Sequence, residues 1–164
     1  MIAPGSSQSH MTERPILHVI LVEPEIAANT GAIGRTCVAA GAKLWLVRPL
    51  GFRLDDRRVR RAALDYWAHL DYQVVDDVQQ AIRLIGPART WSFTTRASRL
   101  YTDADFRKGD ALVFGSESGG LPTTWLASQP VDRLVRIPIR PEARTLNLAN
   151  AASIGVFEAI RQIG

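Results

Sequence analysis

Residues 136–150, R-I-P-I-R-P-E-A-R-T-L-N-L-A-N, are the stretch around which this chain is organised. The residues that lead into it, 131–137, read as a strand, and two prolines then end the strand because proline cannot donate a ladder hydrogen bond. A helix follows, with Asn147 and Asn150 in its first turn and apolar residues at helical spacing up to about Ile163. A strand, an irregular loop and a helix N-terminus can together hold a polar ligand. An ordinary surface loop before a C-terminal helix is the alternative.

The same alternation of strand and helix extends back through the chain. Residues 16–22, I-L-H-V-I-L-V, are almost all apolar, which is typical of a strand buried on both faces of a parallel sheet. Further strands are expected at 43–47, 72–75, 89–95, 111–114 and 131–137. Helices are expected at 29–40, 62–68, 77–85, 123–127 and 147–163. This order predicts an α/β fold, a single domain with a mostly parallel sheet and helices on both faces.

Composition limits the function. The 164 residues are enough for one domain with a sizeable core, and no apolar run approaches the ~18 residues of a membrane span. The net charge of +4 permits a nucleic-acid partner, and only two of the twenty basic residues are lysines, so forked arginine contacts are favoured. A single cysteine, Cys37, excludes an internal disulfide and fits a reducing cytoplasm. The scattered histidines give no metal-ligand spacing, so we expect no metal.

The first fifteen residues show no signal peptide, since they are polar and lack an apolar centre. We expect residues 1–15 to be a disordered N-terminal extension. Residues 5–10, G-S-S-Q-S-H, resemble an expression linker, which would make Met11 the natural start. The folded domain is expected at 16–164, in the cytoplasm.

Three loops follow the C-terminal ends of predicted strands, at 23–34, 115–122 and 138–147, and ligands gather at such loops in parallel sheets. The glycine-rich loop G-S-E-S-G-G, 115–120, lacks the Gly-Lys-Ser/Thr of a phosphate loop and the spacing of a dinucleotide fingerprint. It is not a nucleophile elbow either, because glutamate stands where the serine would be. These absences argue against ATPase, dehydrogenase and hydrolase functions.

Three segments resemble, in order, the motifs of the SPOUT superfamily of RNA 2′-O-methyltransferases. They are N-T-G-A-I-G-R at 29–35, F-G-S-E-S-G-G-L-P at 114–122, and I-P-I with R-T-L-N-L-A-N at 137–139 and 144–150. Three others are similar to the TrmL type, the tRNA (cytidine/uridine-34)-2′-O-methyltransferases: E-P-E-I at 23–26, P-L-G-F at 49–52 and R-R-A-A-L-D-Y at 60–66. The resemblance covers 16–164. It implies a C-terminal trefoil knot, S-adenosyl-L-methionine as methyl donor, a tRNA substrate methylated at the wobble ribose, and a homodimer formed through the 29–40 helix and the C-terminal helix.

The resemblance also places the cofactor, largely against backbone amides and carbonyls. By position, the contacts are Phe93, Thr94, Gly115, Glu117, Ile137, Thr145, Leu146 and Asn147. A side chain larger than that of Gly115 would obstruct the ligand. Glu117 is either solvated or orients the loop near the cofactor and Arg35. Asn147 and Asn150 either brace the knot or contact substrate.

The implied reaction needs an activated ribose 2′-hydroxyl, which is a poor nucleophile at neutral pH. Arg35 matches the family position that orients the ribose and stabilises the forming alkoxide, and because arginine stays protonated we favour electrostatic activation. Asn29 either contacts the ribose or caps the first helix. Arg144 is either a catalytic or RNA contact or a surface arginine.

A cluster of basic residues between the second and third predicted strands invites an RNA-binding interpretation. Its members are Arg53, Arg57, Arg58, Arg60 and Arg61. A solvated face partly neutralised by Asp55 and Asp56 is the alternative. Two other functions stay open: methylation of another tRNA or rRNA ribose by the same fold, and a non-catalytic RNA-binding module that kept the knot.

Overall fold

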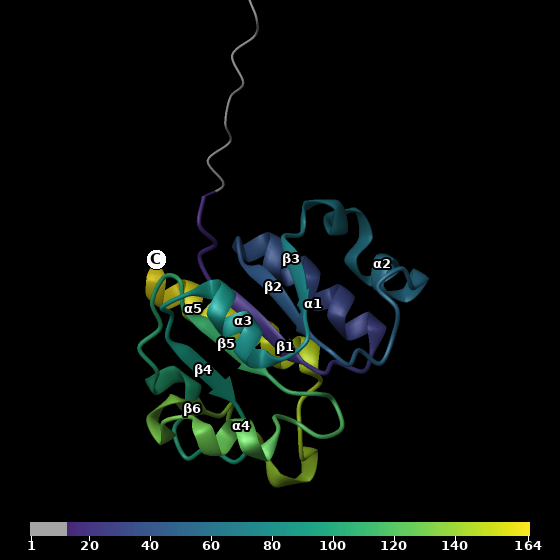
Figure 1. Ribbon diagram of the computed structural model, residues 1–164. Helices are drawn as coiled ribbons and strands as arrows, with labels where there is room; N and C mark the ends of the chain where they lie inside the picture. Colours follow the sequence, from purple (N-terminus) through teal and green to yellow (C-terminus); the bar gives the residue numbers. More distant parts are fainter. Residues whose placement is uncertain (1–12) are drawn as a thin grey trace, which may run out of the picture.

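The computed structural model describes residues 13–164, with the backbone alone at 63 and 64. Its centre is a six-stranded sheet in the order β3-β2-β1-β5-β4-β6, and every pairing in it is parallel (Figure 1). The strands are β1 His18–Val22, β2 Lys43–Val47, β3 Tyr72–Val75, β4 Thr90–Phe93, β5 Ala111–Phe114 and β6 Leu134–Val135. The helices are α1 Ala27–Ala40, α2 Arg57–Ala63, α3 Val78–Ile85, α4 Thr123–Ser128 and α5 Leu148–Ile163. The predicted α/β sheet is confirmed.

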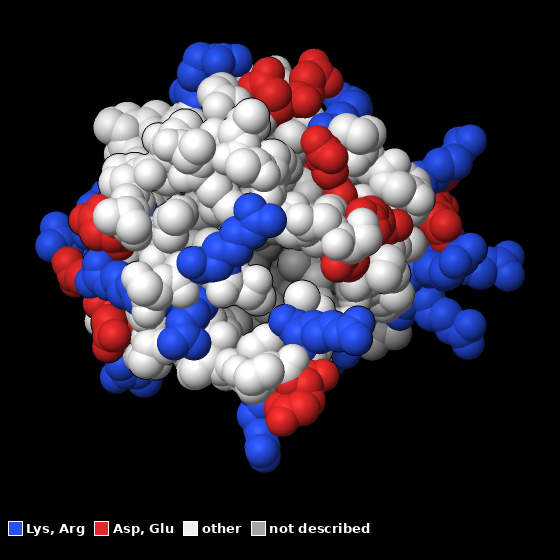
Figure 2. Space-filling view, turned by 90° about the horizontal axis from the view of Figure 1, so that it is seen from below, with Lys and Arg blue, Asp and Glu red and all other residues white. Residues whose placement is uncertain are grey.

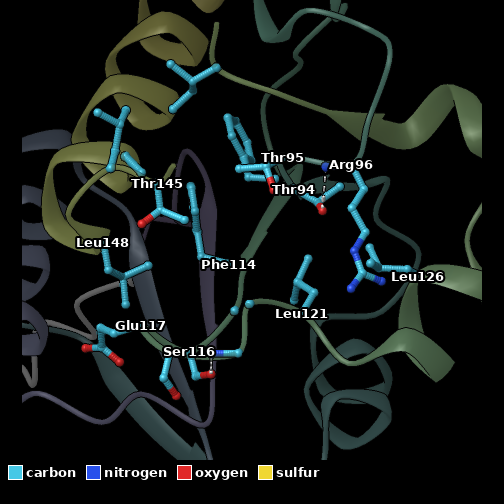
Figure 3. Close-up of a pocket in the computed structure, with 18 of the residues that line it drawn as sticks. Thr94, Thr95, Arg96, Phe114, Ser116, Glu117, Leu121, Leu126, Thr145 and Leu148 are labelled. Carbon is cyan, nitrogen blue, oxygen red and sulfur yellow. Dashed lines mark hydrogen bonds between the residues drawn. The ribbon is translucent and has the colours of Figure 1, made fainter. Parts of the chain in front are cut away.

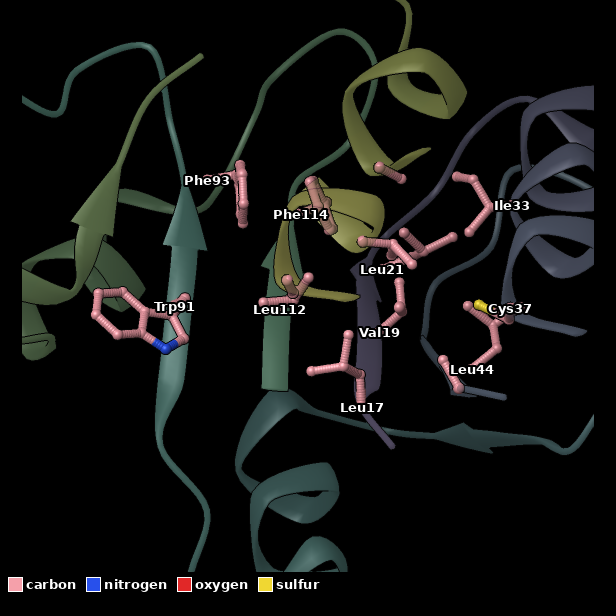
Figure 4. Packing of buried hydrophobic residues seen from close by; sticks show 14 of the residues in the cluster. Leu17, Val19, Leu21, Ile33, Cys37, Leu44, Trp91, Phe93, Leu112 and Phe114 are labelled. Atoms are coloured by element: carbon pink, nitrogen blue, oxygen red, sulfur yellow. The ribbon is translucent and has the colours of Figure 1, made fainter. Parts of the chain in front are cut away.

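Two apolar cores lie on the two faces of this sheet, because successive strand residues point to opposite sides. In β1, Val19 and Leu21 pack with residues of α1 and α5, whereas Ile20 and Val22 pack with residues of α3 and α4. Figure 4 shows the first core, where Cys37 of α1 approaches Leu44. The predicted cover of helices on both faces is thus confirmed.

Local sequence explains where several helices begin and end. Gly41 closes α1 in the left-handed conformation with φ +71°, as its sequence position predicts. Asp77 begins α3, because its carboxylate accepts a hydrogen bond from the backbone N–H of Gln80 at 2.7 Å.

Several predicted elements have different bounds. The strand predicted at 131–137 is wrong over most of its length: Val131–Arg133 is a 3-10 turn and β6 spans only Leu134–Val135. At this sheet edge β6 pairs with Ser92 and Phe93 of β4, and Arg136 after it makes an isolated parallel bridge with Leu100. The helix predicted at 62–68 begins earlier, as α2, and continues as a 3-10 turn at Leu64–His69. The first helix begins at Ala27.

The expected N-terminal extension falls mainly at 1–12, outside the described residues. Within the described part of the chain, no helix is long and apolar enough to cross a membrane.

Candidate active site

A pocket of about 260 Å³ opens at the C-terminal ends of β4 and β5 (Figure 3). That volume lies just below the roughly 300–1,000 Å³ usual for small-molecule sites. Its walls are mainly apolar and its edges carry hydroxyl groups and loop backbone. The apolar wall residues are Phe93, Phe114, Leu121, Leu126, Ile137, Ile139, Leu146, Leu148 and Ala151, and the polar ones include Thr94, Thr95, Ser116, Ser118 and Thr145.

The structure brings together all but one of the residues predicted to contact a cofactor. Phe93, Thr94, Gly115, Glu117, Ile137, Thr145 and Leu146 all line the pocket. Asn147 does not. It is the N-cap of α5, where its side-chain oxygen accepts the backbone N–H of Asn150 at 3.2 Å. Of the two roles that the sequence left open for Asn147, the observed hydrogen bonds are those of a brace.

The glycine-rich loop after β5 folds tightly back on itself. Ser116 and Gly120 exchange backbone hydrogen bonds at 3.0 and 3.2 Å, so the loop closes next to Gly115. A Cβ atom at Gly115 would lie 2.0 Å from the carbonyl carbon of Gly120. A side chain here would thus collide with the loop itself, and the expectation that it would also obstruct the ligand stays a prediction.

Glu117 connects its own loop, 115–122, to the loop that precedes α1. One carboxylate oxygen accepts the backbone N–H of Glu25 at 2.7 Å, and the other accepts the backbone N–H of Ile26 at 3.0 Å. These donors stand at the N-terminus of α1, whose own N-cap, Ile26, offers no side-chain acceptor. The solvated alternative for Glu117 is therefore wrong, and so is the proposal that Asn29 caps this helix.

Asn29 instead lies inside α1 and is buried. Its amide nitrogen donates to Glu117 at 3.2 Å, and its oxygen accepts the side-chain N–H of Asn147 at 3.0 Å. One buried amide thus joins the three loops that the sequence marked as motifs. Whether it also contacts a ribose stays a prediction.

The two predicted catalytic arginines lie outside the pocket lining. Arg35, on α1, is exposed, and its guanidinium carbon stands 4.9 Å from the centroid of the Tyr66 ring. This distance is within cation–π range. Within residues 13–164, none of the ion pairs joins Arg35 to Glu117. Arg144 is also exposed, has φ +61°, and directly precedes Thr145 of the pocket.

The predicted RNA-binding arginines lie on and just before α2. Arg53 is paired with Asp55 at 3.0 Å and Arg58 with Asp56 at 3.7 Å, so the acidic residues do neutralise part of the cluster. Arg57 and Arg61 enter no ion pair within the described part of the chain. Basic side chains project from the side of the molecule that carries α2 (Figures 1 and 2).

Cysteine and histidine are not candidates for chemistry in this pocket. Burial raises the pKa of Cys37 to about 12, which keeps its thiol protonated at neutral pH. No histidine lines the pocket. Among the described residues, no group of three His, Cys, Asp or Glu side chains could hold a metal ion.

Sequence reasoning missed two residues that the geometry singles out. Arg96 lines the pocket, and Tyr66 supports Arg35. A signal for Arg96 was present, because it stands two residues after the predicted contact Thr94. Tyr66 is the last residue of the 60–66 segment that resembles the TrmL type, but only the fold brings it next to Arg35.

Comparison with known proteins agrees with this geometry. A tRNA (cytidine(34)-2′-O)-methyltransferase of Burkholderia cenocepacia (strain HI2424) is 47% identical over 151 residues, which cover 91% of this chain and 97% of the relative. A solved structure concerned with 2′-OH methylation of C/U34 on tRNA is 42% identical, with a TM-score of 0.81 over 89% of this chain and 95% of its own. The AdoMet-bound rRNA methyltransferase from Sinorhizobium meliloti is 26% identical, with a TM-score of 0.81 over 93% of this chain and 60% of its own.

A family match covers the same region. Residues 16–157 match the SpoU rRNA methylase family and include the pocket, α1 and most of α5. The fold, the three motif loops and the nearly full-length alignment with the relatives all indicate the same family. The chain therefore belongs to the SpoU rRNA methylase family.

Proposed function

We propose that this protein transfers a methyl group from S-adenosyl-L-methionine to the ribose 2′-hydroxyl of cytidine or uridine at wobble position 34 of tRNA. The main support for this proposal is the pocket, to which the motif loops contribute. Relatives named for this specificity align with the chain over nearly their whole length. The resemblance to the TrmL type is confirmed by these relatives.

The chemistry of the pocket fits this methyl donor. Apolar walls such as Phe93, Phe114 and Leu148 suit an adenine ring, and hydroxyl groups and loop backbone at the edge suit a ribose and an amino-acid end. The residues proposed to hold the donor are Phe93, Thr94, Gly115, Glu117, Ile137, Thr145 and Leu146, and Asn147, which lies outside the lining, is proposed to contribute by bracing the loop that carries Thr145 and Leu146. When bound, S-adenosyl-L-methionine supplies an electrophilic methyl group.

The protein's own contribution is orientation and charge. We assign Arg35 to the ribose oxygen, where a fixed guanidinium would stabilise developing negative charge better than water does. Asn29 supports this role, because its hydrogen bonds tie α1, which carries Arg35, to Glu117 and Asn147 of the pocket loops. Arg144 is assigned to the RNA beside the pocket. The reaction proposed here uses no metal.

Assembly and location complete the proposal. The C-terminal segment is proposed to form the trefoil knot, within one catalytic domain at 16–164 in the cytoplasm. The homodimer is proposed to form along α1 and α5, which are joined by the hydrogen bond between Thr36 and Ser153 at 3.0 Å. Ile26, before α1, and Phe157, on α5, are exposed by 48% and 49%, so both apolar side chains are accessible to a partner. A monomer mass by light scattering at micromolar concentration would contradict the dimer.

The function is tested by methyl transfer to matched tRNA substrates. Labelled S-adenosyl-L-methionine is incubated with the protein and tRNA, with a control tRNA that already carries a 2′-O-methyl group at position 34. We expect incorporation into the first tRNA alone. Equal incorporation into both would mean that another ribose is the target, and cofactor binding without incorporation would mean a non-catalytic module.

A further inference from the structure

Among the residues that the structure describes, Arg96 is the single cation in the lining of the pocket. The other charged lining residue, Glu117, already accepts hydrogen bonds from Glu25, Ile26 and Asn29. Glu117 is therefore already engaged by protein hydrogen bonds, whereas the positive charge of Arg96 is available to a ligand.

The guanidinium of Arg96 has no protein counter-ion in the described part of the chain. None of the ion pairs there includes it, and the hydrogen bond recorded for the residue is made by its backbone N–H to the Thr94 hydroxyl at 3.3 Å. That bond holds the turn after β4. Figure 3 shows the side chain beside Leu126, across the pocket from Thr145 and Leu148.

A guanidinium in this place suits a carboxylate ligand. Arginine binds carboxylates through two parallel N–H···O bonds, and Arg96 is exposed at the pocket, where a ligand can reach it. The methyl donor of the proposed function carries one carboxylate, at its amino-acid end, while its adenine has no charge and suits the apolar walls. The carboxylate of the donor and the guanidinium of Arg96 are thus opposite in charge, whereas the sulfonium and the α-ammonium of the donor are positive and gain nothing from Arg96.

We propose that Arg96 binds the carboxylate of the cofactor's methionine moiety and selects for ligands in which this end is intact. The proposal rests on the proposed function. It makes Arg96 a specificity-determining residue of the donor site and gives it no part in activating the ribose. A contact with a tRNA phosphate is the competing use of the same charge, and the experiment separates the two.

The test is calorimetric titration of the full chain with two ligands. S-adenosylhomocysteine carries the amino-acid end, and 5′-methylthioadenosine lacks it. We expect Arg96→Met to weaken S-adenosylhomocysteine by roughly tenfold or more, as for loss of a charge-assisted hydrogen bond, and to leave 5′-methylthioadenosine unchanged. Arg96→Lys should recover part of the loss. Arg83→Met, at an exposed arginine on α3 away from the pocket, should alter neither affinity.

Other outcomes overturn the proposal in distinguishable ways. Equal weakening of both ligands would mean that Arg96 only shapes the wall. Unchanged S-adenosylhomocysteine binding, together with weaker and less salt-dependent tRNA binding, would assign Arg96 to a phosphate. A wild-type chain that binds neither ligand would contradict the proposed function itself, whatever the variants do. Thermal unfolding of each variant verifies that it is folded before titration.

Discussion

The carboxylate of Glu117 accepts a hydrogen bond from the side-chain amide of Asn29 at 3.2 Å, although 88 residues separate the two in the chain. The same carboxylate holds the backbone N–H groups that open α1. The helix that carries Arg35 is therefore anchored to the loop that lines the pocket. We therefore expect substitutions in the glycine-rich loop to affect α1 as well.

Glu117→Gln should destabilise the protein. The amide has one acceptor oxygen where the carboxylate has two, so its NH₂ group must face a backbone N–H of Glu25 or Ile26. We expect a loss of about 1–3 kcal/mol in the free energy of unfolding, measured by urea denaturation, and weaker S-adenosylhomocysteine binding. Glu142→Gln, at an exposed carboxylate, is the control and should change neither. Equal stability of the two variants would contradict the anchoring role.

Gly115→Ala should disrupt the glycine-rich loop, because the added methyl group would meet backbone atoms of Gly120 and Leu121 that cannot move independently. We expect a cost of about 3 kcal/mol in unfolding free energy, the upper part of the range for overpacking, together with loss of cofactor binding. Gly119→Ala is the matched control, since its new methyl group would stand 3.3 Å from the Ser116 Oγ, the end of a side chain rather than backbone. If both variants bind cofactor normally, the close approach at Gly115 is unimportant.

Arg35 and Tyr66 should act as a pair in methyl transfer. Arg35→Ala should lower the single-turnover rate by about 100-fold or more, as when a preorganised donor is removed, and Arg35→Lys should remain well below wild type. Tyr66→Phe keeps the ring and should be near normal. Tyr66→Ala should lose a few-fold in rate, consistent with about 0.5–1 kcal/mol for an exposed cation–π contact. A normal rate for Arg35→Lys would count against the assigned role.

Charge reversal on α2 should weaken tRNA binding. Arg57 and Arg61 are exposed on one helix, one turn apart. If they contact phosphates, the double change to Glu should lower affinity and reduce the slope of log K against log salt by about 1–2, measured by filter binding over a salt series. Arg83→Glu, on α3, is the control. An unchanged slope would leave these arginines as a solvated face.

Stability should fall as the pH drops below 6.5 because of His18. Burial, assisted by Lys43 and opposed by Asp71, lowers the pKa of His18 below its ordinary 6.5. The unfolded chain then binds a proton at a higher pH than the folded one, so acidification favours unfolding. His18→Gln keeps an acceptor for the Trp45 indole N–H, which now donates to Nδ1 at 3.1 Å. It should flatten this part of the pH profile of urea midpoints, and a profile as steep as wild type would contradict the assignment.

Elements with a strong local pattern could be predicted from sequence. The apolar run at 16–22 became β1, and the Gly41 cap ended α1, because each depends on the residues present at that place. The short edge strand β6 could not be predicted, since its pairing with Ser92 and Phe93 of β4 is a tertiary contact. The same distinction between local pattern and tertiary contact applies to the site. Motif loops placed the pocket, but the use of Glu117 as a cap and the meeting of Arg35 with Tyr66 depend on tertiary contacts.

The position of Gly155 has a consequence for synthesis on the ribosome. A Cβ there would stand 2.7 Å from the Phe93 ring and 3.2 Å from that of Phe114, so α5 seats directly on the strands that floor the pocket. Residues 145–151 supply another of its walls. During synthesis all six strands are therefore made before α5. The pocket can enclose a methyl donor only after α5 has packed against them.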